Sequence, residues 1–127
     1  MEYRKILNEK DALSFISETN GLHDGYIISL SYRHDGYTWG NPMYVDSNKS
    51  VLELRIMVTS IWNTLVELVF EGIQQFQIRE NTNEIPDSSI AFTQEGFVIW
   101  CGDNSTEADA MQDSNYVIAK KMKWRTI

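Results

Sequence analysis

The sequence is poor in cysteine and in long apolar runs. Its single cysteine, Cys101, cannot form an internal disulfide, whereas secreted domains of this size often carry several. We therefore expect a reducing, cytoplasmic setting. No run approaches the roughly 18 apolar residues that span a bilayer, and the first residues lead into a polar stretch. Neither a membrane-spanning segment nor a targeting segment is expected.

Positive charge is also scarce. Eleven lysines and arginines stand against eighteen aspartates and glutamates, which gives a net charge of -7. Such a field repels phosphate backbones and anionic lipid surfaces, so neither nucleic acid nor a membrane is an expected partner. A protein with a basic surface fits this charge. The alternative is that the surplus carboxylates merely keep a small protein soluble.

The familiar catalytic motifs are missing. There is no glycine-rich phosphate loop, Gly-x-Ser-x-Gly elbow, Cys-x-x-Cys pair or His-Glu-x-x-His run. Cys101 has no base beside it and is expected to be a small buried residue. We therefore predict no catalytic residue and no cofactor. No metal site is predicted either, because the acidic residues near the C-terminus lack EF-hand spacing and are expected to form a solvated loop. They are Asp103, Glu107, Asp109 and Asp113.

One helix is indicated near the start of the chain. Asn8 is placed to cap a first turn with Asp11 three residues on, and Asn20-Gly21 suits the left-handed conformation that ends many helices. These signals predict a helix over residues 9–19. Its apolar stripe is expected to comprise Ala12, Leu13, Phe15 and Ile16.

After Gly21 the apolar period changes to two, which predicts strands. The first half-buried strand is expected to place Tyr26, Ile28, Leu30 and Tyr32 on one face. Asp35-Gly36 suits a tight hairpin turn, followed by a return strand over residues 37–45 that Gly40 and Pro42 interrupt.

Further strands are predicted along the rest of the chain. They cover residues 52–58, a segment opened by Trp62-Asn63 and ended at Phe70 by a Glu71-Gly72 turn, then residues 76–78, 90–92, 97–101 and 116–124. In the last strand, Tyr116, Ile118, Met122 and Trp124 are expected on one face. The chain is thus predicted to be one domain, residues 1–127, of the mainly β (α+β) class. We expect a strongly curved antiparallel sheet, barrel or sandwich of about eight strands with the N-terminal helix packed against it.

A tetrapeptide occurs twice, as His23-Asp24-Gly25-Tyr26 and His34-Asp35-Gly36-Tyr37. Eight extended residues between the copies span roughly 26 Å, so the two histidines are expected at opposite ends of a strand and cannot share a metal ion. His23 and Asp24 form a candidate acid–base or ligand-binding pair. The competing interpretation is that both copies are turns in which each histidine bonds nearby backbone.

Aromatic residues are numerous, and three of them stand apart from the expected core. Tyr37, Trp39 and Tyr44 are predicted to be exposed, whereas Tyr26, Tyr32 and Trp124 alternate with apolar residues. An exposed aromatic group of this kind is a candidate ligand-binding surface. Core packing is the alternative for the aromatic residues as a whole.

The order of short motifs resembles that of a family of small bacterial proteins of uncharacterised activity. The resemblance lies in Leu22-His23-Asp24-Gly25, Glu67-Leu68-Val69-Phe70-Glu71-Gly72, Ile85-Pro86-Asp87, Ile99-Trp100 and Lys123-Trp124-Arg125. It implies a bacterial, intracellular protein and assigns no catalytic residue. In broad character the chain is also similar to immunity proteins, which neutralise partner toxins.

Two functional hypotheses follow. The first is a non-enzymatic module that binds a protein through acidic and aromatic surface, with an immunity-type protein as one form of it. The second is a small-ligand-binding or hydrolytic domain with a concave aromatic face and His23 and Asp24 at its rim. The oligomeric state is not indicated by any motif.

Overall fold

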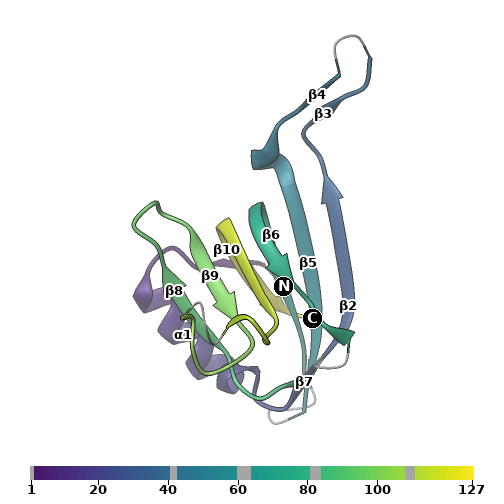
Figure 1. Cartoon of the computed structure of the whole chain (residues 1–127). Coiled ribbons are helices and arrows are strands. Elements are labelled where there is room, and N and C mark those ends of the chain that lie inside the picture. The colour runs from purple at the N-terminus through teal and green to yellow at the C-terminus, as the bar shows by residue number, and fades with distance from the viewer. Residues whose placement is uncertain (1, 41–42, 60–63, 81–83, 108–110) are drawn as a thin grey trace.

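The computed structural model describes residues 2–40, 43–59, 64–80, 84–107 and 111–127. Within these ranges most of the chain is extended, and one α-helix, α1 (Glu9–Thr19), packs against the strands (Figure 1). The strands are β1 (Arg4–Lys5), β2 (Gly25–His34), β3 (Tyr37–Thr38), β4 (Tyr44–Val45), β5 (Ser50–Val58), β6 (Thr64–Gln77), β7 (Glu84–Ile85), β8 (Ser89–Phe92), β9 (Val98–Cys101) and β10 (Tyr116–Thr126).

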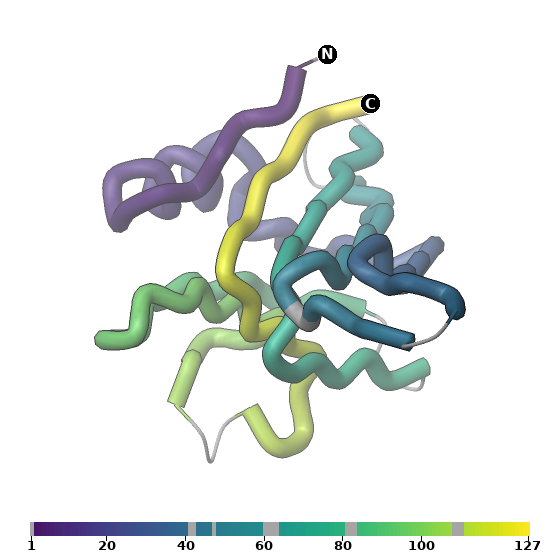
Figure 2. Tube along the Cα trace, turned by 90° about the horizontal axis from the view of Figure 1, so that it is seen from above, coloured from purple at the N-terminus to yellow at the C-terminus, as the bar shows by residue number. Residues whose placement is uncertain are grey.

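Eight of these strands form one antiparallel sheet in the order β7-β2-β5-β6-β10-β9-β8, with β1 paired to β10. The sheet curls into a half-barrel, and α1 lies on its inner side (Figure 1). The first and last strands run side by side, as the view from above shows (Figure 2). The predicted α+β class, with a strongly curved antiparallel sheet and one N-terminal helix, is confirmed, and the closed barrel and the sandwich are not adopted.

The helix has the predicted bounds because its ends are set locally. The Asn8 side chain accepts a hydrogen bond from the Asp11 amide at 3.0 Å, and Asn20 adopts a φ of 52° after the last turn. Ala12 and Phe15 are buried, but Leu13, expected in the same stripe, is 70% exposed. The stripe is narrower than predicted because the helix contacts the sheet along positions 12, 15 and 19, and Leu13 lies about 100° further round. The described helices include none with the length and apolarity of a membrane span.

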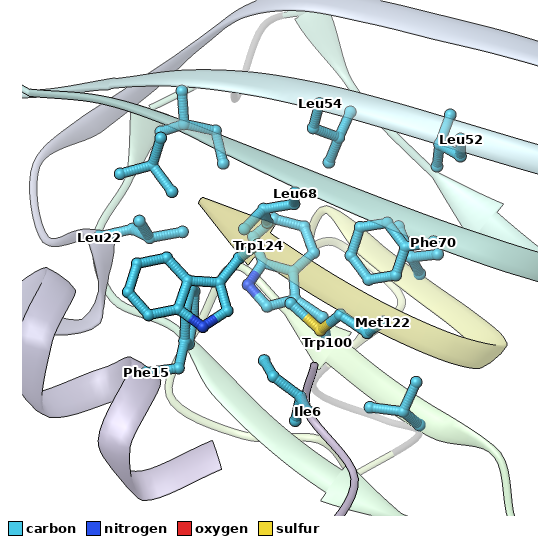
Figure 3. Close-up of a cluster of buried hydrophobic side chains, with 14 of the residues drawn as sticks. Ile6, Phe15, Leu22, Leu52, Leu54, Leu68, Phe70, Trp100, Met122 and Trp124 are labelled. Carbon is cyan, nitrogen blue, oxygen red and sulfur yellow. The ribbon is translucent and has the colours of Figure 1, made fainter. Parts of the chain in front are cut away.

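The core lies between α1 and the inner face of the sheet. Phe15 meets the Trp124 ring edge-on, with 5.2 Å between the ring centres. The rings of Phe70 and Trp100 also pack together, with 6.2 Å between their centres. Leu22 closes the end of this cluster beside Trp124 (Figure 3). These large side chains exclude water from the helix-covered part of the half-barrel.

The predicted turn at Glu71-Gly72 is wrong. β6 continues through Gly72 to Gln77, so the separate strand at residues 76–78 belongs to the same element. Gly72 has a φ of 69° and faces Lys120 so closely that a side chain would begin 3.0 Å from the Lys120 Cβ. Glycine is needed here because it adopts this conformation without strain, and the strand continues past it into a bulge between Ile73 and Gln75.

The predicted faces of the last strand are also wrong in part. Tyr116 and Ile118 lie in a second cluster with Cys101, whereas Met122 and Trp124 lie in the main core. Val117 and Ala119 share the main core with Met122 and Trp124, so the alternation of side chains along β10 changes between Ala119 and Met122, where Lys120 packs against Gly72.

A second bulge changes the faces of β2. The register with β5 shifts between Ile27 and Ser29, so Ile28 stands outside the ladder and Ile27 enters the core. Tyr26 pairs with Met57 and faces outward. The predicted single face for Tyr26, Ile28, Leu30 and Tyr32 is therefore wrong.

Asp35-Gly36 does not form the predicted hairpin turn between two neighbouring strands. β2 pairs with β5, and the two chains stay together beyond the sheet through hydrogen bonds from the Asp35 amide to the Lys49 carbonyl and from the Asp46 amide to the Gly36 carbonyl. They lead into β3 and β4, which pair only with each other. We call residues 35–40 and 43–49 the arm; it projects from the half-barrel (Figure 1). The expected interruption at Pro42 and the strand start at Trp62-Asn63 lie outside the described residues.

Truncation of Phe15 tests this account of the core. Phe15→Ala is expected to lower the free energy of unfolding by about 3–5 kcal/mol, because it removes a fully buried ring and leaves a cavity beside Trp124. Leu13→Ala on the same helix is the matched control, with an expected change below about 0.5 kcal/mol. Urea unfolding of both variants measures the difference, and equal losses would contradict the packing described.

Candidate functional site

The tip of the arm gathers the three aromatic residues that the sequence singled out. Tyr37, Trp39 and Tyr44 line a hollow of about 570 Å³ together with Thr38, Met43 and Val45. All of these apolar side chains are exposed, and Trp39 is 85% exposed. None of the lining residues carries a charge. The predicted exposure of Tyr37, Trp39 and Tyr44 is therefore confirmed, and the structure places them on one site.

The base of the arm is fixed by close backbone packing. A side chain at Gly36 would begin 2.5 Å from the Lys49 Cβ and 2.9 Å from the Asp46 carbonyl oxygen, so only glycine lets the two chains approach here. Asp46 caps the short 3-10 turn η2 (Ser47–Lys49) by accepting from the Asn48 amide at 3.0 Å. The aromatic tip is thus carried on a defined stalk.

Ion pairs brace the same region from the outer face. The Arg33 guanidinium donates to Asp35 at 3.0 Å and to Glu53 at 2.9 Å. One arginine therefore links the end of β2, the start of the arm and the neighbouring strand β5. Arg33 and Asp35 are about half exposed and Glu53 is 30% exposed, so each pair contributes little to stability on its own.

The first His-Asp-Gly turn lies at the other end of β2. The His23 Nδ1–H donates to the Pro86 carbonyl at 2.5 Å, and Nε2 lies 3.4 Å from an Asp24 carboxylate oxygen. The turn is built from left-handed residues, and at Gly21 a side chain would collide with Asp87. His23 therefore bonds the backbone of a segment 63 residues further along the chain, not that of its own turn, and its ring stays half exposed.

Its surroundings raise the pKa of His23 above that of a free imidazole. The largest cause is the hydrogen bond to the Pro86 carbonyl, and the negative charge of Asp24 adds to it. Asp87 and Glu84 contribute in the same direction. The protonated ring is thus favoured in a small acidic cluster.

The structure does not bring the candidate site residues into one place. His23 and Asp24 precede β2, whereas Tyr37, Trp39 and Tyr44 follow it, and its ten residues extend about 33 Å. The two copies of the repeat therefore lie at opposite ends of a strand, as predicted. His23 and Asp24 line neither this hollow nor the next largest one described, which lies beside β1 and β10.

Neither cysteine nor acidic loop residues form a further site in the described residues. Cys101 is fully buried, and this burial raises the pKa of its thiol, as expected for a small core residue. Asp103 is used within its own loop, where it accepts from the Ser114 hydroxyl at 3.1 Å. No metal-binding group of three or more His, Cys, Asp or Glu residues is present in the described ranges, and Asp109 lies outside them.

One buried charge was not singled out from the sequence. Glu67 lies on the outer face of β6 and is only 2% exposed. It accepts hydrogen bonds from the Tyr3 hydroxyl, from Arg125 Nε at 3.0 Å and from Arg55 Nε at 3.2 Å. The local sequence indicates this cluster only through a single charge inside the apolar run of residues 65–70. All three hydrogen-bond donors come from distant segments of the chain.

Burial alone raises the pKa of Glu67, but its donors more than offset this effect. The hydrogen bond from Tyr3 and the charge and hydrogen bond of Arg125, with that of Arg55, hold the pKa below its usual range. The Tyr3 ring also lies under the cationic groups of Lys123 and Arg125. This cluster ties the N-terminal segment across three strands, which is a structural task.

Comparison with known proteins yields no relatives: no family model, no curated protein and no solved structure matches the chain. The short motifs behind the bacterial resemblance nevertheless have structural roles. The His23 turn contacts the segment after β7 through Pro86, and Glu67 contacts Arg125 near the C-terminus. These motifs therefore pair with each other inside the fold.

Titration of His23 tests the geometry of the first turn. We expect its pKa to lie above that of a free imidazole, and Asp24→Asn to lower it only part of the way, because the Pro86 carbonyl is the larger cause. Because the folded pKa is raised, the stabilising effect is complete below the unfolded pKa and is lost as the pH rises through the folded pKa. NMR titration of the ring protons measures the shift. A normal or lowered value would contradict the geometry.

Neutralising the buried carboxylate tests the Glu67 cluster. Glu67→Gln is expected to lower the free energy of unfolding at pH 7 by about 1–3 kcal/mol, since charged hydrogen bonds are lost while the arginines stay partly solvated. With a depressed folded pKa, Glu67 stabilises above its unfolded pKa, and this effect fades as the pH falls through the folded pKa. Glu95→Gln, in an exposed turn, is the control. An unchanged acid profile for Glu67→Gln would refute the assignment.

Proposed function

We propose that this chain is a non-enzymatic protein-binding domain that presents the apolar tip of its arm to a protein partner. The observation that carries the proposal is the group of exposed side chains on a projecting hairpin. Tyr, Trp and Met are enriched at the centres of protein interfaces, and burying one such side chain contributes roughly 1.5–3 kcal/mol. The group consists of Tyr37, Trp39, Met43, Tyr44 and Val45.

Charge favours a protein over a lipid surface or nucleic acid as the partner. The chain has a net charge of -7, and Asp35 and Asp46 lie at the base of the arm. Both anionic membranes and phosphate backbones are repelled by this field, whereas a basic rim around an apolar pocket is attracted. Arginine or lysine side chains of such a partner also stack favourably on exposed rings. An immunity-type role with a toxin partner is one form of this proposal, and a cytoplasmic location goes with it.

The alternative of a small-ligand-binding or hydrolytic domain has less support. It needs His23 and Asp24 at the rim of the aromatic surface, and these residues lie at the other end of β2. The Nδ1 of His23 is also bonded to the Pro86 carbonyl, which leaves only Nε2 beside Asp24 for chemistry. The aromatic tip therefore stands better as a protein contact than as the wall of an active site.

Site-specific photo-crosslinking in the native cells tests the proposal. A benzoylphenylalanine placed at Trp39 is expected to give a discrete protein adduct, because the tip is the contact surface. The same residue at Leu13, which is also strongly exposed but lies on α1, is the matched control. The adducts are separated by mass and identified by peptide sequencing.

A second pair of substitutions tests whether the aromatic side chains of the tip are needed for the adduct to form. Tyr37→Ser with Tyr44→Ser is expected to reduce the crosslinking yield at position 39 on the order of tenfold while the melting temperature stays unchanged, since both rings are exposed. An adduct to lipid, equal adducts at positions 39 and 13, or no adduct at position 39 would each overturn the proposal.

A further inference from the structure

β2 has one open edge. From Tyr26 to His34 it pairs with β5 except at the bulged Ile28, but on its other side β7 pairs only with Gly25 and Tyr26. No strand in the described part of the chain pairs with residues 27–34 on that side. Beyond the bulge at Ile28, residues 29–34 form a regular edge about 20 Å long. Unpaired backbone groups of this kind are a template for another strand.

The inner-face side chains along this edge are incompletely covered. Leu30 lies opposite Leu54, and Tyr32 lies opposite Leu52. The two β5 leucines are fully buried, whereas Leu30 is 44% and Tyr32 48% exposed. The difference arises because β5 has a neighbour on each side and β2 does not. The Tyr32 ring stacks on the Phe76 ring with 5.6 Å between the ring centres. Tyr32 is therefore already held in position for a further strand to cover it.

We propose that an extended segment of the protein partner adds as a strand to the open edge of β2, in continuation of the contact at the arm tip. This inference rests on the proposed function and names the kind of segment that is bound. Main-chain hydrogen bonds to residues 29–34 supply affinity, and alternate side chains of the segment pack over Leu30 and Tyr32. A segment on this edge leads directly to the tip, because β2 continues into the arm.

The charges around the edge indicate the composition of that segment. Carboxylates outnumber cations around the edge, and they favour lysine or arginine between the apolar positions of the segment. The same charges oppose a second copy of the chain, because an antiparallel β2–β2 contact would bring two acidic edges together. The carboxylates are Asp24, Glu84 and Asp87 at one end, Asp35 and Asp46 at the other, and Glu53 opposite Ser31; the cations are Arg33, Lys49 and Arg55, which lies opposite Ser29 and is paired with the buried Glu67.

Selection from a phage library of random twelve-residue peptides on the full chain tests the inference. Selected peptides are expected to alternate apolar with basic residues. Amide hydrogen exchange of the complex is expected to slow within residues 29–34, because strand addition gives these backbone groups new partners. The edge strand β8 at the opposite side of the sheet is the internal control and is expected to show no change.

Two matched variants separate edge binding from a general effect of charge. Leu30→Lys is expected to weaken peptide binding on the order of tenfold, since it puts a cation under a basic segment. Met57→Lys adds the same charge on the other face of the neighbouring strand, where exposure is similar at 41%, and is expected to leave the affinity unchanged. Methylation of every second backbone nitrogen in the peptide is expected to abolish binding, because it removes the ladder donors.

The outcomes that overturn strand addition are distinct from those that overturn the proposed function. Peptides that protect residues 37–45 but not residues 29–34 would refute strand addition and leave the arm tip as the contact. Failure to select any peptide, or equal losses from Leu30→Lys and Met57→Lys, would also refute it. A dimer by light scattering with protection of residues 29–34 would assign the edge to a second copy and refute the proposed segment.

Discussion

The structure depends on how much of the inner face one short helix can cover. α1 has eleven residues and is about 16 Å long, whereas β2 extends about 33 Å at the far edge of the sheet. Phe15 and Trp124 seal the side of the half-barrel that α1 reaches. Cover then declines across the sheet, so that Leu54 is fully buried while its neighbour Leu30 is not. Leu30 and Tyr32 stay partly exposed because β2 lacks both this cover and, among the described residues, a second neighbouring strand beyond Tyr26.

The outer face has no helix over it in the described structure and is stabilised in a different way. Charged side chains on neighbouring strands alternate in sign: Arg33 pairs with Glu53, Arg55 with Glu67, and Lys123 with Glu71. Each exposed pair of this kind contributes little to stability. Glu67 differs because it is buried, and a buried carboxylate without a partner would strongly destabilise the fold. It therefore fixes where the N-terminal segment lies, and β1 in turn closes the edge of β10.

Sequence reasoning succeeded where the cause was local. The helix bounds follow from Asn8 and Asn20, and the exposed aromatic group was found because Tyr37, Trp39 and Tyr44 are close together in the chain. It failed where the pairing of strands from distant parts of the chain determines the local structure. Gly72 has the conformation of a turn residue, but β10 keeps the strand running past it, and the bulge at Ile28 exists only relative to β5. The Glu67 cluster could not be assembled in advance, since its donors lie near both termini and in β5.

Stability does not account for the arm. Its rings make no contribution to the main core, and exposing large apolar side chains to water has a cost that folding does not recover. The stalk is nevertheless well specified, with Gly36 allowing close backbone approach and Arg33 bridging the base. A rigid support beneath an exposed apolar tip lowers the entropy lost on association. Because β2 provides both the open edge and one side of this stalk, the proposed partner segment can follow β2 from the edge to the tip.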